Sequence, residues 1–155
     1  MNNPTTINAA PGVPFIEIVR EFDAPASAVF RAHTDPELFR QWIGPRGMQI
    51  DSLELDARTG GGWKYAFRGG GDMQFSFRGV FHTVEPDTLI IQTVEFNMAP
   101  AQVGLTTTVL AEVDGRTRLT SREIYPSVEA RDAALASGME HGVNEGYEKL
   151  DELLA

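Results

Sequence analysis

The sequence predicts an α+β domain in which a curved antiparallel sheet of seven strands wraps around one long C-terminal helix. Two patterns support this prediction. From Met48 to Tyr125 hydrophobic residues alternate with period two, and turn signals divide the stretch into strand-length segments. From Ser127 onward the apolar residues recur instead with the spacing of an amphipathic helix. The length of 155 residues fits one domain.

The first part of the chain predicts an arm, a strand and two short helices. Residues 1–14 are polar and rich in Asn, Pro, Thr and Ala, so we expect a disordered arm before a single domain over 15–155. Phe15–Phe22 alternates as the first strand. Asp23 comes two residues before Pro25 and Asp35 comes directly before Pro36, and both patterns are typical of a capped helix start.

Six further strands are expected in the centre of the chain. Asp114–Gly115 is the clearest hairpin signal, and the short connections indicate an antiparallel meander. The glycines at 60–62 and 69–71 adjoin strands and lack the lysine of a phosphate-binding loop, so they predict turns, with 69–72 a candidate flap. The predicted strands lie near 48–56, 62–68, 73–85, 88–96, 103–113 and 116–125.

The last segment, 127–155, predicts one long helix with Ser127 as its N-cap. Gly142 and Gly146 fall within its apolar arc, and Gly138 lies at the edge of that arc. Each glycine costs a helix interior about 0.5–1 kcal/mol relative to alanine. We therefore expect that they either let the helix approach the sheet closely or leave room for a ligand beside it.

Composition excludes several classes of partner and chemistry. The net charge of −9, from 22 acidic and 13 basic residues, argues against nucleic acid and anionic membrane as partners. The absence of cysteine excludes disulfides and thiolate chemistry. The start of the chain has no signal-peptide pattern and no apolar run reaches a membrane-spanning length, so a cytoplasmic protein is expected.

Metal and nucleophilic chemistry find no support in the residue pattern. His33, His82 and His141 fall on three different predicted elements without metal-ligand spacing. No Gly-x-Ser-x-Gly motif or convincing Ser–His–Asp arrangement is present. The sequence therefore predicts no metal and no cofactor.

Five segments carry a resemblance to a known family. They read FDAPASAVFRAHTDPELFRQWIGP, GGGWKYAF, FRGVFHTVEPDTLI, GRTRLTSREIYPS and RDAALASGMEHGVNEGYEKLDELLA, and together they extend over roughly residues 15–155. In their order and spacing the chain resembles the SRPBCC, START-like or helix-grip superfamily, and most closely its branch of heat-shock-protein ATPase activator homologues. It differs from common relatives in having Val143 in place of a tryptophan and Trp42–Ile43 in place of two aromatics. Both differences would enlarge or reshape an apolar pocket.

The resemblance makes the first and last strands neighbours, which suggests a buried polar pair. Arg20 shares the apolar face of the first strand, and Glu123 shares a face with Leu119 and Tyr125 on the last. Because an unpaired buried charge is costly, we expect Arg20 and Glu123 to meet inside the domain. Two interpretations stay open: a structural ion pair, or the polar end of a ligand site with Glu123 as acid or base. Arg20, Glu123 and Tyr125 are the candidate catalytic residues.

Aromatic side chains suggest a cavity between the sheet and the long helix. They are either plain core residues or the lining of a site for a flat hydrophobic ligand. The candidate ligand-binding residues are Trp42, Trp63, Tyr65, Phe77, Phe81, Phe96, Met139, Gly142, Val143 and Tyr147.

The resemblance implies binding of a small hydrophobic or aromatic molecule and favours a ligand-binding protein over an enzyme. If the chain is an enzyme, it implies polyketide cyclase-like, aromatase-like or dehydratase chemistry. The alternative is a co-chaperone-like, stress-response interaction domain without a small-molecule substrate, which would need an exposed apolar patch outside the cavity. A homodimer is a further expectation from the superfamily.

Overall fold

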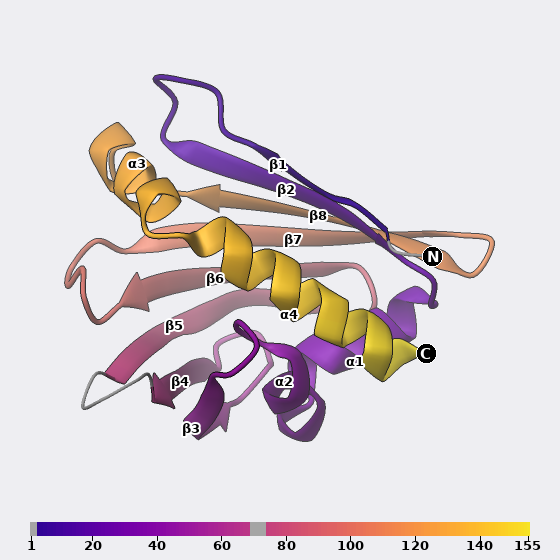
Figure 1. Cartoon of the computed structure of the whole chain (residues 1–155). Helices are drawn as coiled ribbons and strands as arrows, with labels where there is room; N and C mark the ends of the chain where they lie inside the picture. The colour runs from indigo at the N-terminus through magenta and orange to yellow at the C-terminus, as the bar shows by residue number, and fades with distance from the viewer. Residues whose placement is uncertain (1–2, 69–73) are drawn as a thin grey trace.

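An eight-stranded antiparallel sheet curves around a C-terminal helix in the computed structural model, which describes residues 3–68 and 74–155 (Figure 1). The strands are β1 (Thr5–Asn8), β2 (Phe15–Phe22), β3 (Gln49–Leu55), β4 (Gly62–Arg68), β5 (Gln74–Glu85), β6 (Leu89–Phe96), β7 (Gly104–Val113) and β8 (Arg116–Ile124). The helices are α1 (Ala26–Thr34), α2 (Pro36–Trp42), α3 (Val128–Ala136) and α4 (Met139–Leu154). The order in the sheet is β1-β2-β8-β7-β6-β5-β4-β3, which leaves β1 and β3 as its edges. The predicted α+β fold is confirmed, with eight strands where seven were expected.

The additional strand comes from the segment predicted to be a disordered arm. Thr5–Asn8 pairs with β2 in antiparallel register, from Thr5 opposite Arg20 to Asn8 opposite Glu17. Its threonines and isoleucine suit a strand, and the free edge of β2 supplies the hydrogen bonds that the segment cannot make alone. The expectation of disorder is therefore wrong for these residues.

The central strands agree closely with the sequence pattern. The bounds of the six predicted segments differ by at most one residue from those of β3, β4, β5, β6, β7 and β8. Asp114–Gly115 forms the hairpin between β7 and β8, as predicted. The proposed flap at 69–72 and the predicted strand start at 73 lie outside the described residues.

The helix signals succeeded at two positions and failed at two others. Asp35 accepts a hydrogen bond from the Glu37 amide and caps α2, and Ser127 accepts one from the Ala130 amide and caps α3. Asp23 does not cap α1, whose N-cap position is Pro25. The long C-terminal helix is present, but its expected start at Ser127 is wrong: Gly138 adopts a left-handed conformation (φ +86°), which ends α3 and starts α4. Glycine takes this conformation without the steric penalty of a Cβ atom.

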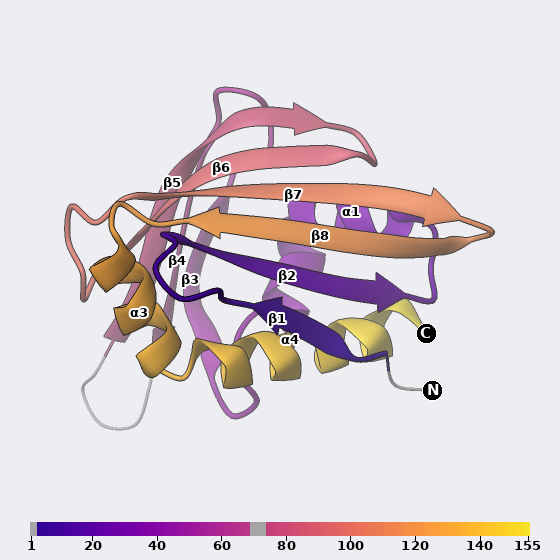
Figure 2. The same ribbon diagram turned by 90° about the horizontal axis from the view of Figure 1, so that it is seen from above.

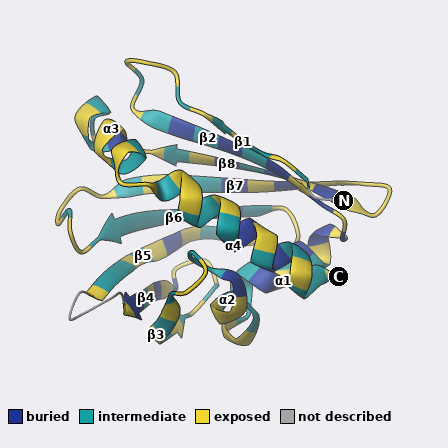
Figure 3. Cartoon of the chain, viewed as in Figure 1, coloured by how far each residue is buried: buried dark blue, intermediate teal, exposed yellow. Residues whose placement is uncertain are grey.

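The main core lies between the inner face of the sheet and helices α1 and α4. It includes Ile16, Ile18, Phe22, Val29, Leu119 and Leu150, all fully buried or nearly so. A smaller cluster consists of the buried side chains of Trp63, Phe81 and Ile90, which belong to β4, β5 and β6. Figure 3 shows the buried positions concentrated where β2, β7 and β8 approach α1 and α4. In Figure 2, α1 lies behind β7 and β8, so the viewer looks onto the outer face of these strands.

Helix α4 is held against the connection between α2 and β3. A Cβ atom on Gly146 would lie 3.3 Å from the carbonyl oxygen of Trp42, and one on Gly142 would lie 3.6 Å from the Pro45 ring. The two glycines therefore face a neighbouring chain segment, and Gly146 is buried there. Of the two expected roles, close approach of the helix is the one the structure supports, because the neighbours are protein atoms.

Candidate functional site

A carboxyl group without a cationic partner stands on the inner face of β8. Glu123 accepts a hydrogen bond of 3.0 Å from the hydroxyl of Tyr125, which follows the end of the strand. No positively charged group of the described chain is paired with Glu123. The alternation of β8 explains its position, because Leu119 and Ser121 on the same face are buried. The structure thus brings together two of the three candidate catalytic residues.

Aromatic side chains form a wall on the same inner face, across the sheet from Glu123. The ring of Phe77 lies 4.8 Å from that of Phe96 in a stacked arrangement and 5.4 Å from that of Tyr65. Phe39 of α2 packs against Tyr65 from the other side, at 5.4 Å. Tyr65, Phe77 and Phe96 remain half-buried. The wall therefore keeps accessible aromatic surface on the same inner face as Glu123.

Burial favours the protonated forms of the Glu123 carboxyl and of the Tyr65 and Tyr147 hydroxyls. Burial raises the pKa of the Glu123 carboxyl, and the hydrogen bond from Tyr125 opposes this increase only in part. Burial also raises the pKa values of Tyr65 and Tyr147, and the negative charge of Glu123 adds to both increases. Glu123 therefore lies close enough to both tyrosines to influence them. A carboxyl with a raised pKa can donate as well as accept a hydrogen bond.

The predicted pairing of Arg20 with Glu123 is wrong. Arg20 lies opposite Leu119, whereas Glu123 lies opposite Ile16, so the two residues are four positions apart along neighbouring strands. Arg20 instead forms an ion pair with Asp151 of α4, at 2.6 Å. The face was predicted correctly, but the register separates the two charges by about 13 Å of strand.

Asp151 is the partner that sequence reasoning missed. It stands one turn after Tyr147, whose ring is buried and contacts Phe22, so the same helix face reaches Arg20. That i, i+4 spacing was the available signal.

Several predicted ligand-binding residues belong to the core. Trp42 is buried, donates a hydrogen bond of 2.8 Å to the Ala32 carbonyl and stacks on Tyr147 at 6.0 Å. Phe81 is buried with Trp63. Two others, Met139 and Val143, are partly buried against the main core. These contacts support a packing role for the buried rings.

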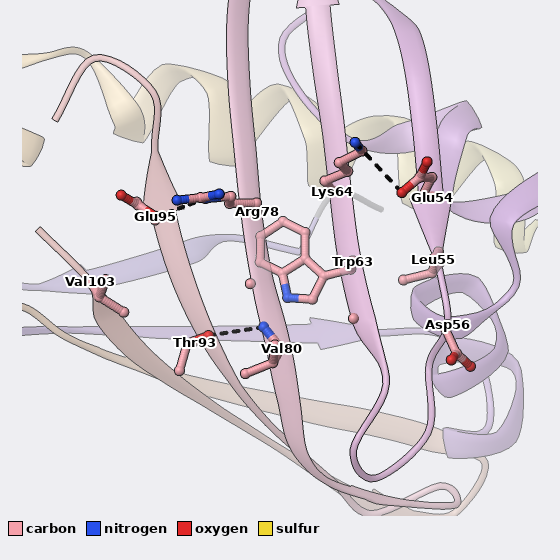
Figure 4. Close-up of a pocket in the computed structure, with 12 residues that line it drawn as sticks. Glu54, Leu55, Asp56, Trp63, Lys64, Arg78, Val80, Thr93, Glu95 and Val103 are labelled. Carbon is pink, nitrogen blue, oxygen red and sulfur yellow. Dashed lines mark hydrogen bonds and ion pairs between the residues drawn. The ribbon is translucent and has the colours of Figure 1, made fainter. Parts of the chain in front are cut away.

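One pocket of the described structure lies on the outer side of the sheet and not between the sheet and α4 (Figure 4). It has a volume of about 600 Å³ and involves the outward-facing Lys64, Arg78 and Val80, with α4 behind the sheet in this view (Figure 4). Trp63 is the one predicted ligand residue among those lining it, and its buried indole N–H has no hydrogen-bond partner in the described structure. A second pocket of about 350 Å³ lies between the N-terminal segment, Arg20 and α4. The expected location of the cavity is therefore not supported by either pocket.

The charged residues around the larger pocket already have partners. Lys64 lies 3.8 Å from Glu54, and Arg78 lies 2.8 Å from Glu95. Glu95 also accepts a hydrogen bond from the Ala101 amide, which lowers the pKa of its carboxyl together with Arg78. These pairs make the inner-face carboxyl of Glu123 the stronger candidate for chemistry.

The three histidines are far from forming a common site. His33 lies inside, with Nδ1 2.7 Å from the Val29 carbonyl oxygen, and burial lowers the pKa of its ring. His82 is exposed, and His141 pairs with Glu145 on the surface of α4.

Among the described residues, no helix has the length and apolar character needed to cross a bilayer.

Comparison with known proteins identifies the family. Residues 23–155 match the family described as activator of Hsp90 ATPase homolog 1-like protein. No curated protein sequence gave a significant match.

Solved structures agree with this family match. The chain is similar to a Rhodobacter sphaeroides protein with 27% identity, coverage of 96% and 97% of the two chains, and a TM-score of 0.87. A Staphylococcus epidermidis protein is also 27% identical, with 96% and 93% covered and a TM-score of 0.81. A Silicibacter pomeroyi protein described as AHSA1 shares the fold at 21% identity, with 90% and 96% covered and a TM-score of 0.74. The chain therefore belongs to the activator of Hsp90 ATPase homolog 1-like family and has the helix-grip fold of the SRPBCC superfamily.

Proposed function

We propose that the protein binds a small, neutral aromatic or hydrophobic molecule that carries a carbonyl group, on the inner face of the sheet. The observation that carries the proposal is Glu123, a carboxyl with no cationic partner in the described chain, on the same face of the sheet as an accessible aromatic wall. An apolar ligand body would stack on Phe77 and Phe96, as flat rings do in such sites. The family match supports the same class of ligand, because this fold family commonly binds hydrophobic molecules.

The polar group determines which end of the ligand faces β8. In its protonated form Glu123 donates a hydrogen bond to a carbonyl oxygen, while its other oxygen keeps the bond from Tyr125. A buried hydrogen bond of this kind selects against ligands that lack the acceptor, because the carboxyl would then stay unpaired. In its ionised form Glu123 cannot donate, and it would repel the carbonyl oxygen.

The test uses the fluorescent aromatic ketone prodan as a probe. We expect the wild-type protein to bind it more weakly as the pH rises, since ionisation of Glu123 removes the donor. Glu123→Gln keeps a donor at every pH, so its affinity should be insensitive to pH over the same range. Phe77→Ala should weaken binding at all pH values.

The matched control is Val109→Ala, which shortens a side chain on the other side of the sheet. It should bind prodan like the wild type. Equal pH profiles for wild type and Glu123→Gln would contradict the role of Glu123, and binding unaffected by Phe77→Ala would contradict the location.

An interaction domain is the second candidate function, favoured by apolar residues exposed on the outer face of the sheet. Leu105, Val109 and Ile124 expose 38–44% of their surface there. Such residues are typical of protein contacts when they are contiguous. This function requires neither Glu123 nor the aromatic wall, so loss of prodan binding would leave it standing.

The finer expectations from the sequence remain predictions. They are a cytoplasmic location, a homodimer and, if the ligand is turned over, cyclase-like or dehydratase chemistry. For that chemistry Glu123 would be the acid or base, and Glu123→Gln should abolish turnover of a bound substrate while binding persists.

A further inference from the structure

The outer face of the sheet carries an apolar band across its middle strands. Val109 of β7 lies opposite Leu89 of β6, and Leu105 lies opposite Ile124 of β8. Ile91 and Val19 extend the band on the same face. Figure 2 shows this side of β6, β7, β8 and β2 toward the viewer, with α1 behind it. We call these six residues the outer band.

The same face is electrically neutral, unlike the protein as a whole. Strand β7 places no charged residue on it, since its outward positions are Leu105, Thr107, Val109, Ala111 and Val113. The outward charges of β2, β5, β6 and β8 are four glutamates and four arginines: Glu17, Glu21, Glu85, Glu95, Arg78, Arg116, Arg118 and Arg122. Several pair across strands, among them Arg122 with Glu17 at 3.4 Å and Arg78 with Glu95 at 2.8 Å.

The excess negative charge is elsewhere, and α4 holds much of it. This helix has five carboxylates and one lysine in 16 residues. Two copies of a chain with net charge −9 repel each other most strongly through such surfaces. A strongly basic partner would favour α4 for the same reason and would find no complement on the outer face.

From this distribution we propose that the outer band is the contact surface for a second copy of the chain in a symmetric, sheet-to-sheet homodimer. A two-fold contact presents the same surface from both sides, so a neutral apolar face is self-complementary, whereas a charged face is not. The proposal does not depend on the ligand proposed for the inner face. It commits the outer face to self-association, although the second candidate function would admit other proteins there.

The available area predicts a weak dimer. The four strands that carry the outer band span about 19 Å across the sheet and residues 104–110 extend about 23 Å along it, which gives a footprint of roughly 440 Å². Standard stable interfaces bury about 800 Å² on each partner. We therefore expect a dimer that dissociates in the micromolar range, with its centre near Thr107 of β7.

Sedimentation equilibrium of the full chain between about 5 and 300 µM tests the proposal. The average mass should rise from 17.0 kDa toward twice that value as the concentration increases. Raising the salt from about 20 to 300 mM should strengthen association, because screening weakens the repulsion between acidic copies. A mass that stays at 17.0 kDa over the whole range would overturn the proposal, and so would weaker association in high salt.

Lysine substitutions locate the contact. Val109→Lys, and as a second variant Leu105→Lys, should abolish dimerisation, because two-fold symmetry doubles each unpaired charge. Val113→Lys is the matched control: it lies on the same face of the same strand, beyond the outer band, and Val113 is 70% exposed. Association that survives in both band variants, or is lost equally in the control, contradicts the location.

Crosslinking gives a readout that does not depend on affinity. The chain has no cysteine, so Thr107→Cys introduces a single thiol at the expected centre of the contact. On oxidation this variant should form a covalent dimer at least tenfold faster than Val113→Cys. Equal rates for the two variants would overturn the proposed centre.

Discussion

The two ends of the inner face of the sheet differ in the partners that they provide for a charged residue. Arg20 is 2% exposed, and Asp151, Thr5 and the Glu21 carbonyl satisfy its guanidinium. Glu123, on the neighbouring strand, has one hydrogen bond from Tyr125 and no cationic partner in the described chain. The comparison indicates that the Arg20 end stabilises the fold, and it motivates the proposal that the carboxyl at the Glu123 end meets another molecule.

Removing Arg20 should have the largest effect on stability. We expect Arg20→Met to lower the free energy of unfolding by about 3 kcal/mol, since breaking a buried pair leaves the other charge without compensation. The value falls at the low end of the usual range because Asp151 is 27% exposed. Urea denaturation measures it.

Arg122→Met is the control for Arg20→Met. It removes an arginine from the outer face of the same sheet, where Arg122 is 51% exposed and pairs with Glu17. Its cost should stay below about 1 kcal/mol. Equal costs for both variants would contradict the stabilising role assigned to the Arg20 end.

Gly146 tests the packing between the two ends. Gly146→Leu should destabilise the protein by about 2 kcal/mol, because a side chain there meets the Trp42 backbone and overpacks the contact. Gly142→Ala is the matched control and should gain up to about 1 kcal/mol from helix propensity, since its neighbour lies at an ordinary distance. Thermal unfolding of both variants measures these changes in stability. A stable Gly146→Leu protein that loses prodan binding would instead restore the idea that this glycine leaves room for a ligand.

Tyr125→Phe should have a smaller effect, at the Glu123 end. We expect a loss of about 1 kcal/mol for one partly buried hydrogen bond. Because the hydroxyl bond lowers the pKa of Glu123, its removal should move that pKa further upward. NMR titration of the Glu123 side-chain carbon measures the change. A downward shift would show that the bond favours the protonated form.

Glu123→Gln should have the smallest effect on the free energy of unfolding, and the size of that effect should depend on pH. Burial raises the pKa of Glu123 in the folded protein above its value in the unfolded chain. The native state therefore binds the proton more tightly, and wild-type stability falls as pH rises between those two values. Glutamine does not ionise, so the variant lacks this loss of stability. It should be as stable as the wild type in acid and more stable than the wild type above the folded-state pKa of Glu123. Unfolding curves across pH check this, and a variant that becomes relatively less stable as pH rises would contradict it.

Much of the architecture could be predicted because it depends on local patterns. Period-two alternation located β3 to β8 within one residue, and side-chain caps at Asp35 and Ser127 marked two helix starts. Glu123 was placed correctly on the inward face that it shares with Leu119 by the same alternation. The strand β1 was missed because its short polar segment is ordered by the free edge of β2 rather than by its own sequence.

Alternation and helical spacing by themselves determined which face of each element points inward, and hence the fold class. Only the tertiary structure decided which inward groups meet, because contact between strands depends on register and contact with a helix depends on where it crosses the sheet. A shift of four residues separated Arg20 from Glu123. Helix α4, which starts after the left-handed Gly138, crosses the sheet where its Asp151 reaches Arg20.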